Sequence, residues 1–273
     1  MNLKMLFSLR ALRVLSLFIL TVGSSYAQDI SVSPSVITLS GNPGETISET
    51  LTITNSGKMP YEFLVSIKDW KREISGNKVH ADAGTLPNSN SAWIRVAENS
   101  FVIKPGERKL VTIYMEIPAE GVGHVASNSM VFLTQTNPQE SATNESAIGI
   151  KIAYEFGVQL FYNPAAAQKG EIEYEQLTFI SAQDEKAAKV QLQYKNDGDV
   201  NKTGTIRVEL TNKESGEEFK LQPVPFAIMP HDVQIMQIAL PAGMPKGNYL
   251  LVSLLDAGAG YNLKVAEKDI YVE

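Results

Sequence analysis

Residues 148–162 read IGIKIAYEFGVQLFY. Every even-numbered position in this stretch is apolar or aromatic, and the odd-numbered positions from 149 to 159 are small or polar. Because successive side chains of a β-strand point to opposite faces, this alternation predicts a strand with one apolar face. At about 3.3 Å per residue, one unbroken strand would extend about 50 Å, well beyond the common length of about five or six residues. A single sandwich domain cannot bury the whole of such a row.

This apolar row has two interpretations. In the first, part of it lies on an open sheet edge that adds a strand to a partner protein, because unpaired apolar edges bind other strands. The side chains predicted to contact the partner are Ile148, Ile150, Ile152, Tyr154 and Phe156. In the second interpretation the same residues complete the core of their own domain, and a kink near Gly157 divides the strand.

Shorter segments with the same period of two lie on both sides of this stretch. They are residues 50–54, 61–67, 110–117, 129–133, 189–194, 205–210, 233–240 and 249–255. Turn signals separate them, among them Asn55-Ser56-Gly57 and Asn196-Asp197-Gly198. No window has the pattern of an amphipathic helix. About seven short strands in each half predict an all-β chain of two tandem immunoglobulin-like β-sandwich domains.

The two halves of the chain also resemble each other in sequence. Three landmarks recur at nearly constant spacing: Pro105 and Pro230 (125 residues), Pro118 and Pro241 (123), Gly123 and Gly247 (124). A Pro-, Ala- and Gly-containing segment at residues 163–170 interrupts the strands. We therefore expect an N-terminal domain at 28–164 and a C-terminal domain at 165–273.

Residues 1–27 have the pattern of a cleaved signal peptide. Lys4, Arg10 and Arg13 form a basic region, residues 14–22 are a short apolar run, and small residues precede the expected cleavage site after Ala27. The apolar run is too short to span a bilayer, and no later stretch is long and apolar enough. These features predict an exported protein without a stable membrane anchor, and the lack of Cys favours the periplasm of a bacterium.

Composition excludes several function classes. A net charge of −6 argues against a nucleic-acid partner, which needs a basic face. Without Cys the chain has no disulfide, thiolate nucleophile or Cys-ligated metal, and its three His residues are far apart in sequence. No nucleophile elbow, phosphate-binding loop or His-Glu-x-x-His motif is present. We therefore expect no enzyme activity, no cofactor and no metal site.

A Leu-Phe-Tyr-Asn-Pro run closes the alternating stretch at residues 160–164. It resembles the end of the last strand of the first domain in periplasmic pilus-assembly chaperones of the PapD type. Residues 240–249 and 254–258 are similar to the carboxy-terminal domain of bacterial chaperone-like proteins. The resemblance covers nearly the whole exported chain.

The resemblance implies a periplasmic chaperone-like protein that binds exported envelope or pilus-type subunits by donating an edge strand. It implies that Ile150, Ile152 and Tyr154 are the donated side chains, flanked by Ile148 and Phe156. Whether two copies of the chain also pair through this edge stays open.

The sequence departs from the family at the charged anchor. The resemblance implies an Arg on the first strand and a Lys on the last, where this chain has the uncharged Val36 and Gln159. The alternative function is an exported structural or adhesive surface-binding module of two immunoglobulin-like domains, with the long strand in its core and no chaperone role.

Overall fold

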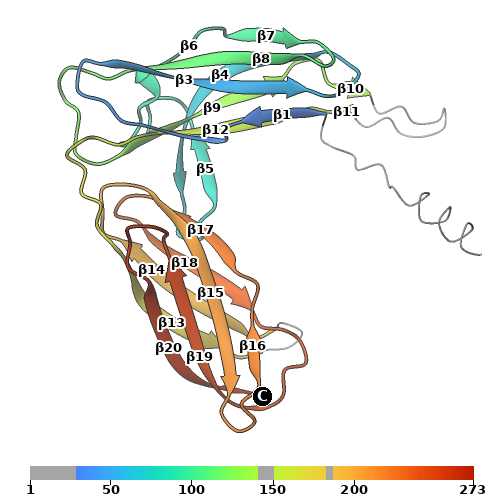
Figure 1. The fold of residues 1–273 in the computed structure, drawn as a ribbon, viewed down its shortest axis with the longest axis vertical. Coiled ribbons are helices and arrows are strands. Elements are labelled where there is room, and N and C mark those ends of the chain that lie inside the picture. The colour runs from blue at the N-terminus through green and yellow to red at the C-terminus, as the bar shows by residue number, and fades with distance from the viewer. Residues whose placement is uncertain (1–28, 141–150, 183–186) are drawn as a thin grey trace, which may run out of the picture.

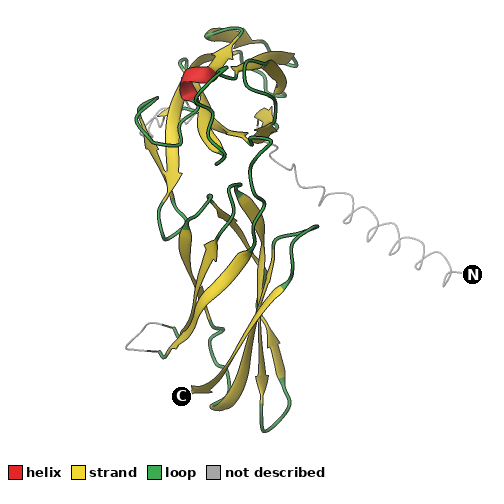
Figure 2. Ribbon diagram, turned by 90° about the vertical axis from the view of Figure 1, so that its left-hand side faces the viewer, coloured by secondary structure: helices red, strands yellow, loops and turns green. Residues whose placement is uncertain are grey.

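The computed structural model describes residues 29–140, 151–182 and 187–273. These residues form two β-sandwiches in tandem (Figure 1). The only helix in the described part of the chain is one 3₁₀ turn at Ser91–Trp93, so strands and loops make up nearly all of it (Figure 2). The signal peptide predicted at residues 1–27 lies outside the described residues. The all-β class and the tandem immunoglobulin-like sandwiches predicted from sequence are confirmed.

Two facing sheets form the first sandwich. One has the strand order β1-β3-β8-β6, and the other has the order β2-β12-β9-β4-β5, with β7 paired to β4. The strands are β1 (Ile30–Ser33), β2 (Val36–Leu39), β3 (Thr46–Asn55), β4 (Tyr61–Arg72), β5 (Lys78–Ala81), β6 (Ile94–Val96), β7 (Ser100–Ile103), β8 (Arg108–Glu116), β9 (Ser127–Gln135) and β12 (Glu155–Tyr162). A separate two-stranded ladder joins β10 (Gln139–Glu140) to β11 (Lys151–Ile152).

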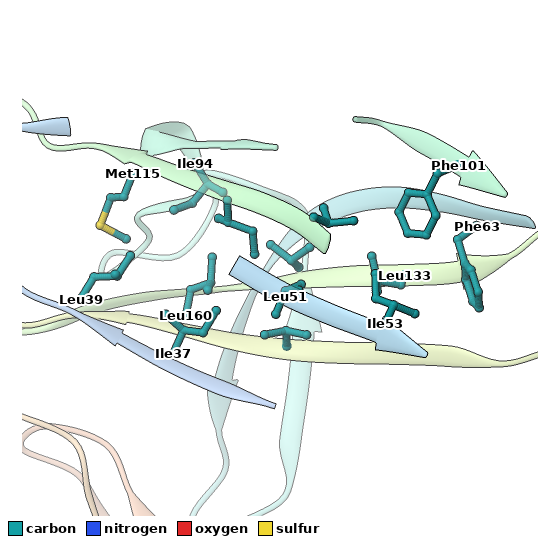
Figure 3. Close-up of a cluster of buried hydrophobic side chains, with 14 of the residues drawn as sticks. Ile37, Leu39, Leu51, Ile53, Phe63, Ile94, Phe101, Met115, Leu133 and Leu160 are labelled. Atoms are coloured by element: carbon teal, nitrogen blue, oxygen red, sulfur yellow. The ribbon is translucent and has the colours of Figure 1, made fainter. Parts of the chain in front are cut away.

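Alternating apolar residues from both sheets fill the first core (Figure 3). Leu51 and Ile53 of β3 face Leu133 of β9 and Leu160 of β12 across the sandwich, and all four are fully buried. This is the period-two burial that the sequence pattern predicts for a strand with one face on a core. The core therefore fixes which face of β12 points inward.

The first segment of the chain changes sheets within a few residues. β1 pairs antiparallel with β3, whereas β2 pairs parallel with β12 in the opposite sheet. Pro34 lies between the two short strands, where a residue without an amide proton ends ladder pairing. Among the described residues, the edge beyond β12 is therefore covered only along the four residues of β2.

The second sandwich consists of a three-stranded and a five-stranded sheet. Their orders are β13-β14-β18 and β16-β15-β19-β20, with β17 paired to β15. The strands are β13 (Ile172–Ile180), β14 (Lys189–Asn196), β15 (Lys202–Asn212), β16 (Glu218–Lys220), β17 (Val224–Ile228), β18 (Val233–Ala239), β19 (Gly247–Asp256) and β20 (Lys264–Val272). Strands of the first sandwich end at Tyr162 and those of the second begin at Ile172, so residues 163–171 connect them.

The similarity of the two halves extends to individual hydrogen bonds. Asn55 is fully buried, and its Nδ2 donates to the carbonyl of Ile103 (3.1 Å) while its Oδ1 accepts from the amide of Gly57 (2.9 Å). In the second sandwich the fully buried Asn196 donates to the carbonyl of Met229 (3.0 Å) and accepts from the amide of Gly198 (3.0 Å). The two Asn-x-Gly turns predicted from sequence therefore have the same structural role.

The Pro105 and Pro230 landmarks occupy matching turns as well. Gly106 follows Pro105 with φ 72°, and His231 follows Pro230 with φ 59°, the only positive φ of a residue other than Gly within the described ranges. A side chain in this left-handed region is unfavourable, so the surroundings of His231 must hold it there. His231 Nε2 lies 2.8 Å from Oδ1 of the buried Asp199.

Two main-chain hydrogen bonds between described residues connect the sandwiches. The β4–β5 hairpin extends from the first sandwich toward the second (Figure 1), and the carbonyl of Ile74 at its turn accepts a hydrogen bond from the amide of Ile235 on β18 (2.7 Å). The amide of Ala126 donates to the carbonyl of Asp199 (2.7 Å). Beside them, Met229 of the second sandwich joins a buried cluster on the outer face of the first: Trp70, Met130, Phe132 and Phe161.

Candidate functional site

The strand predicted to bind a partner lies near the edge of its sheet. β12 pairs antiparallel with β9 along its whole length, from Glu155 opposite Thr134 to Tyr162 opposite Ser127. On its other side β12 pairs with β2 only at residues 159–162. Residues 155–158 therefore have a strand on one side only, within the part of the chain that the structure describes.

Main-chain hydrogen bonds show which residues of β12 face the open side. The carbonyl of Tyr154 accepts a hydrogen bond from the amide of Gln135 at the end of β9 (2.9 Å). The amide of Gln159 donates to the carbonyl of Ser35 beside β2 (3.0 Å). Since successive residues direct their main-chain groups to opposite neighbours, even-numbered residues bond toward β9 and odd-numbered residues face away from it.

The main-chain groups of Glu155 and Gly157 therefore face the open side. Each residue presents one amide and one carbonyl group there, which is the pattern to which a further strand can pair. Glu155 is exposed, and its Oε2 accepts a hydrogen bond from the Thr134 hydroxyl (2.9 Å).

Of the five residues predicted to contact a partner, Ile148 and Ile150 lie outside the described residues. Ile152 belongs to β11 and is 57% exposed. Tyr154 and Phe156 are half-buried and pack against the core of their own sandwich. Among the described members of the predicted five, Ile152 is thus the one with a largely exposed apolar side chain.

The prediction of one unbroken strand over 148–162 is wrong in the described part. β11 ends at Ile152 and β12 begins at Glu155, so the break between the two strands falls at Ala153 and Tyr154 and not at Gly157. The physical reason is a change of partner. β11 pairs with β10, whereas β12 pairs with β9 and β2.

An aromatic cluster supports the start of β12. Tyr154 and Phe156 stack at 6.1 Å between ring centroids, Tyr154 meets Tyr61 edge-on at 5.9 Å, and Phe156 lies 6.1 Å from Phe63. Burial raises the pKa of Tyr61, and the negative charge of Asp29 raises it further. Tyr61 therefore stays a neutral phenol, whose hydroxyl donates to Asp29 Oδ2 at 3.4 Å.

Gly157 is required by the packing on the outer face of β12. A Cβ atom at this position would lie 2.7 Å from the Met130 sulfur and 3.4 Å from the Phe132 ring. Sequence reasoning missed this outer cluster, although β9 carried a signal for it. Apolar residues at consecutive positions, residues 130–133, are typical of a strand that is buried on both faces.

The two positions expected to hold a charged anchor are direct partners in the register of β2 and β12. Val36 lies opposite Gln159 and is 44% exposed. The structure thus brings these two positions together and leaves the pair without charge, so any charged contact with a partner must come from elsewhere in the chain.

Within the described ranges, no group of three or more His, Cys, Asp and Glu side chains is arranged to hold a metal ion. None of the helical segments described there has the length and apolar character of a membrane span. Asp197 and Asp199 lie at the turn between β14 and β15. These two strands belong to different sheets, so the turn carries the chain across the sandwich and does not close a hairpin.

The site thus belongs to a protein of two tandem β-sandwiches with an open strand edge near the end of the first. No protein-family model matches the chain, and no curated protein matches it in sequence.

Solved structures similar to it include fimbrial chaperones and their complexes. One is the complex of CsuC with the tip adhesion subunit CsuE from archaic chaperone-usher pili of Acinetobacter baumannii, at 11% identity over 87% of this chain and 97% of that chain (TM-score 0.46). The E. coli chaperone DraB matches at 14% identity over 89% and 97% (TM-score 0.45). The complex of the Salmonella enterica pilin SafA with the chaperone SafB matches at 11% identity over 91% and 99% (TM-score 0.44).

Proposed function

We propose that the protein is a periplasmic chaperone-like protein that binds exported envelope or pilus-type subunits by strand pairing. The observation that carries this proposal is the open edge at residues 155–158, beside the exposed Ile152. Here the main-chain groups of Glu155 and Gly157 face away from β9, and no strand of the described residues pairs with them. Export by a signal peptide at 1–27 and the domain limits 28–164 and 165–273 are parts of the same proposal.

A partner strand would lie against β12 where β2 ends. Main-chain hydrogen bonds to Glu155 and Gly157 would set its register, and apolar side chains would supply affinity. Ile152 is the described member of the apolar row, and Ile148 and Ile150 are its proposed continuation. Tyr154 and Phe156 form a half-buried aromatic wall beside the pairing site. Burying a side chain such as Ile152 stabilises a complex by about 1.5–3 kcal/mol before ordering costs.

The alternative is an exported structural or adhesive surface module without a chaperone role. It is favoured by the packing of Tyr154 and Phe156, two of the predicted contact residues, against their own core. Such a module would bind through loops or the junction between the sandwiches, so changes at the β12 edge would leave its binding intact.

The two functions are separated by a matched pair of substitutions. Ile152→Asp places a charge beside the open edge, and Val265→Asp, at a residue that is 51% exposed on β20, places the same charge on the other sandwich. Tagged wild-type protein purified from the periplasm should carry a β-rich exported subunit in near one-to-one ratio, identified by mass spectrometry. I152D should lose that subunit, and V265D should keep it.

Both variants should melt within a few degrees of the wild type, because both sites are exposed. A wild-type protein that is recovered alone, or a subunit that I152D and V265D retain equally, would support the surface-module alternative.

A further inference from the structure

A cavity of about 200 Å³ lies where the two sandwiches meet. Trp70 and Arg72 of β4 and the Pro87-Asn88 loop line it from the first sandwich, and Met229 and Asp232 line it from the second. At about 30 Å³ per water molecule in the liquid, this volume accommodates a small ionic group with a few waters but no folded segment.

Arg72 is incompletely bonded in this cavity. Its Nη1 donates to the carbonyl of Gly76 (2.9 Å), while its Nε is buried and has no hydrogen-bond partner among the described residues. A buried donor that lacks an acceptor is costly, and more so on a charged group. The planar guanidinium fork is suited to the oxygens of a carboxylate or a phosphate.

Three cations, Lys71, Arg72 and Lys78, lie close together at this cavity. Arg72 and Lys78 both lie over the ring of Trp70, each 5.5 Å from its centroid. Burial lowers the pKa of Lys78, and the charge of Arg72 lowers it further. Neither these two residues nor Lys71 forms an ion pair within 4 Å in the parts of the chain described. A locally positive site of this kind stands out in a chain of net charge −6.

Asp232 is the one described carboxylate that lines the cavity. It stands on the opposite wall from Arg72 and forms no ion pair with it within 4 Å. Burial has the largest effect on the pKa of Asp232 and raises it. The positive charge of Arg72 acts in the opposite direction and lowers this pKa. The two charges therefore attract each other across the cavity without forming an ion pair. A charged group bound between them would interact with both.

We propose that this cavity between the sandwiches binds one oxyanion group, a carboxylate or a phosphate, with the Arg72 guanidinium as its principal ligand. Lys71 and Lys78 add positive potential, Trp70 and Met229 supply apolar walls, and Asp232 weakens the binding through like charge. The site is separate from the β12 edge and uses none of its residues.

The test is a calorimetric titration of the purified protein in Bis-Tris buffer, with inorganic phosphate in one arm and acetate in the other. Three variants differ in the binding affinity that the proposal predicts. R72Q should weaken binding about tenfold or more, because charge-assisted hydrogen bonds are lost. D232N should tighten it several-fold. R108Q removes the same charge from an exposed site on β8 and should bind like the wild type.

The two arms identify the source of the group. Binding of phosphate alone indicates a phosphate or phosphorylated ligand, binding of acetate alone indicates a carboxylate, and binding of both indicates a general oxyanion site. No binding in either arm overturns the proposal, and so does equal binding by R72Q and R108Q. If R72Q does not fold, D232N decides, since a variant that binds no more tightly than the wild type contradicts the site.

Discussion

The twin asparagines Asn55 and Asn196 allow a stability prediction for each sandwich. We consider Asn196→Ala first. It removes two donated hydrogen bonds, to the carbonyls of Val200 (2.9 Å) and Met229 (3.0 Å), and one accepted from the amide of Gly198 (3.0 Å). It also removes the acceptor for the buried ammonium group of Lys202. The substitution therefore leaves several buried groups without partners at once.

The expected loss follows from these contacts. Each of the three neutral hydrogen bonds contributes about 1 kcal/mol, and a buried charged donor left without its acceptor costs about 1.5–3 kcal/mol. N196A should therefore lower the free energy of unfolding by about 4.5–6 kcal/mol. Asn55 makes the matching neutral bonds, to Met59, Ile103 and Gly57, and holds no lysine. N55A should therefore cost less, about 2–3 kcal/mol.

Calorimetry and urea denaturation followed by circular dichroism measure these losses. In a domain of about 100 residues, a loss of 3 kcal/mol lowers the melting temperature by more than about 10 °C. The matched control is Asn248→Ala, an exposed asparagine of the second sandwich whose one described side-chain bond, to Glu214, is long (3.4 Å). If N196A unfolds within about 0.5 kcal/mol of N248A, the role assigned to the buried Asn-x-Gly turn is wrong.

Three further predictions concern the edge, the junction and pH. Glu155→Pro removes an amide that faces the open side of β12 and should weaken capture of a subunit in a pull-down. The control Gln237→Pro, at a matching edge position of β18, should leave capture unchanged. Trp70→Ala opens a cavity in the cluster between the sandwiches and should cost about 3–5 kcal/mol by urea denaturation, with a larger radius of gyration in X-ray scattering. The amide of Gln168 holds the pKa of Asp199 below its ordinary value, and the hydrogen bond to His231 lowers it further. The ionised carboxylate therefore stabilises the fold fully at pH values above the ordinary Asp pKa. This stabilisation is lost as the pH falls through the lowered pKa. Asp199→Asn should therefore lower the melting temperature at pH 7, and the difference from the wild type should shrink toward pH 3.

Local chemistry explains which parts of the fold the sequence predicted. The strands follow from the period-two alternation, and the turns at Asn55 and Asn196 follow from Asx-Gly preferences that act within a few residues. The conformation of His231 was not predictable in the same way. Its matching residue, Gly106, adopts a positive φ without strain, whereas nothing in the local sequence marks a histidine for that region.

Long-range packing explains what the sequence did not predict. The break at Ala153 and Tyr154 depends on which strands β11 and β12 pair with, and the contact of Ile74 with Ile235 depends on how the sandwiches meet. The sequence separates His124 and His231 by more than 100 residues. Their side chains are 70% and 51% exposed, yet both lie within 4.0 Å of the same Asp199 oxygen.

The register of β12 connects core packing to the proposed function. Val158, Leu160 and Tyr162 are buried, so a slip by one residue would turn all three out of the core and is strongly disfavoured. The same register fixes Glu155 and Gly157 as the residues whose main-chain groups face the open side. A partner strand would therefore meet an edge that is already extended and in a single alignment, and would not bear the cost of ordering it. In this way the residues that stabilise the first sandwich also position the edge proposed to bind a partner.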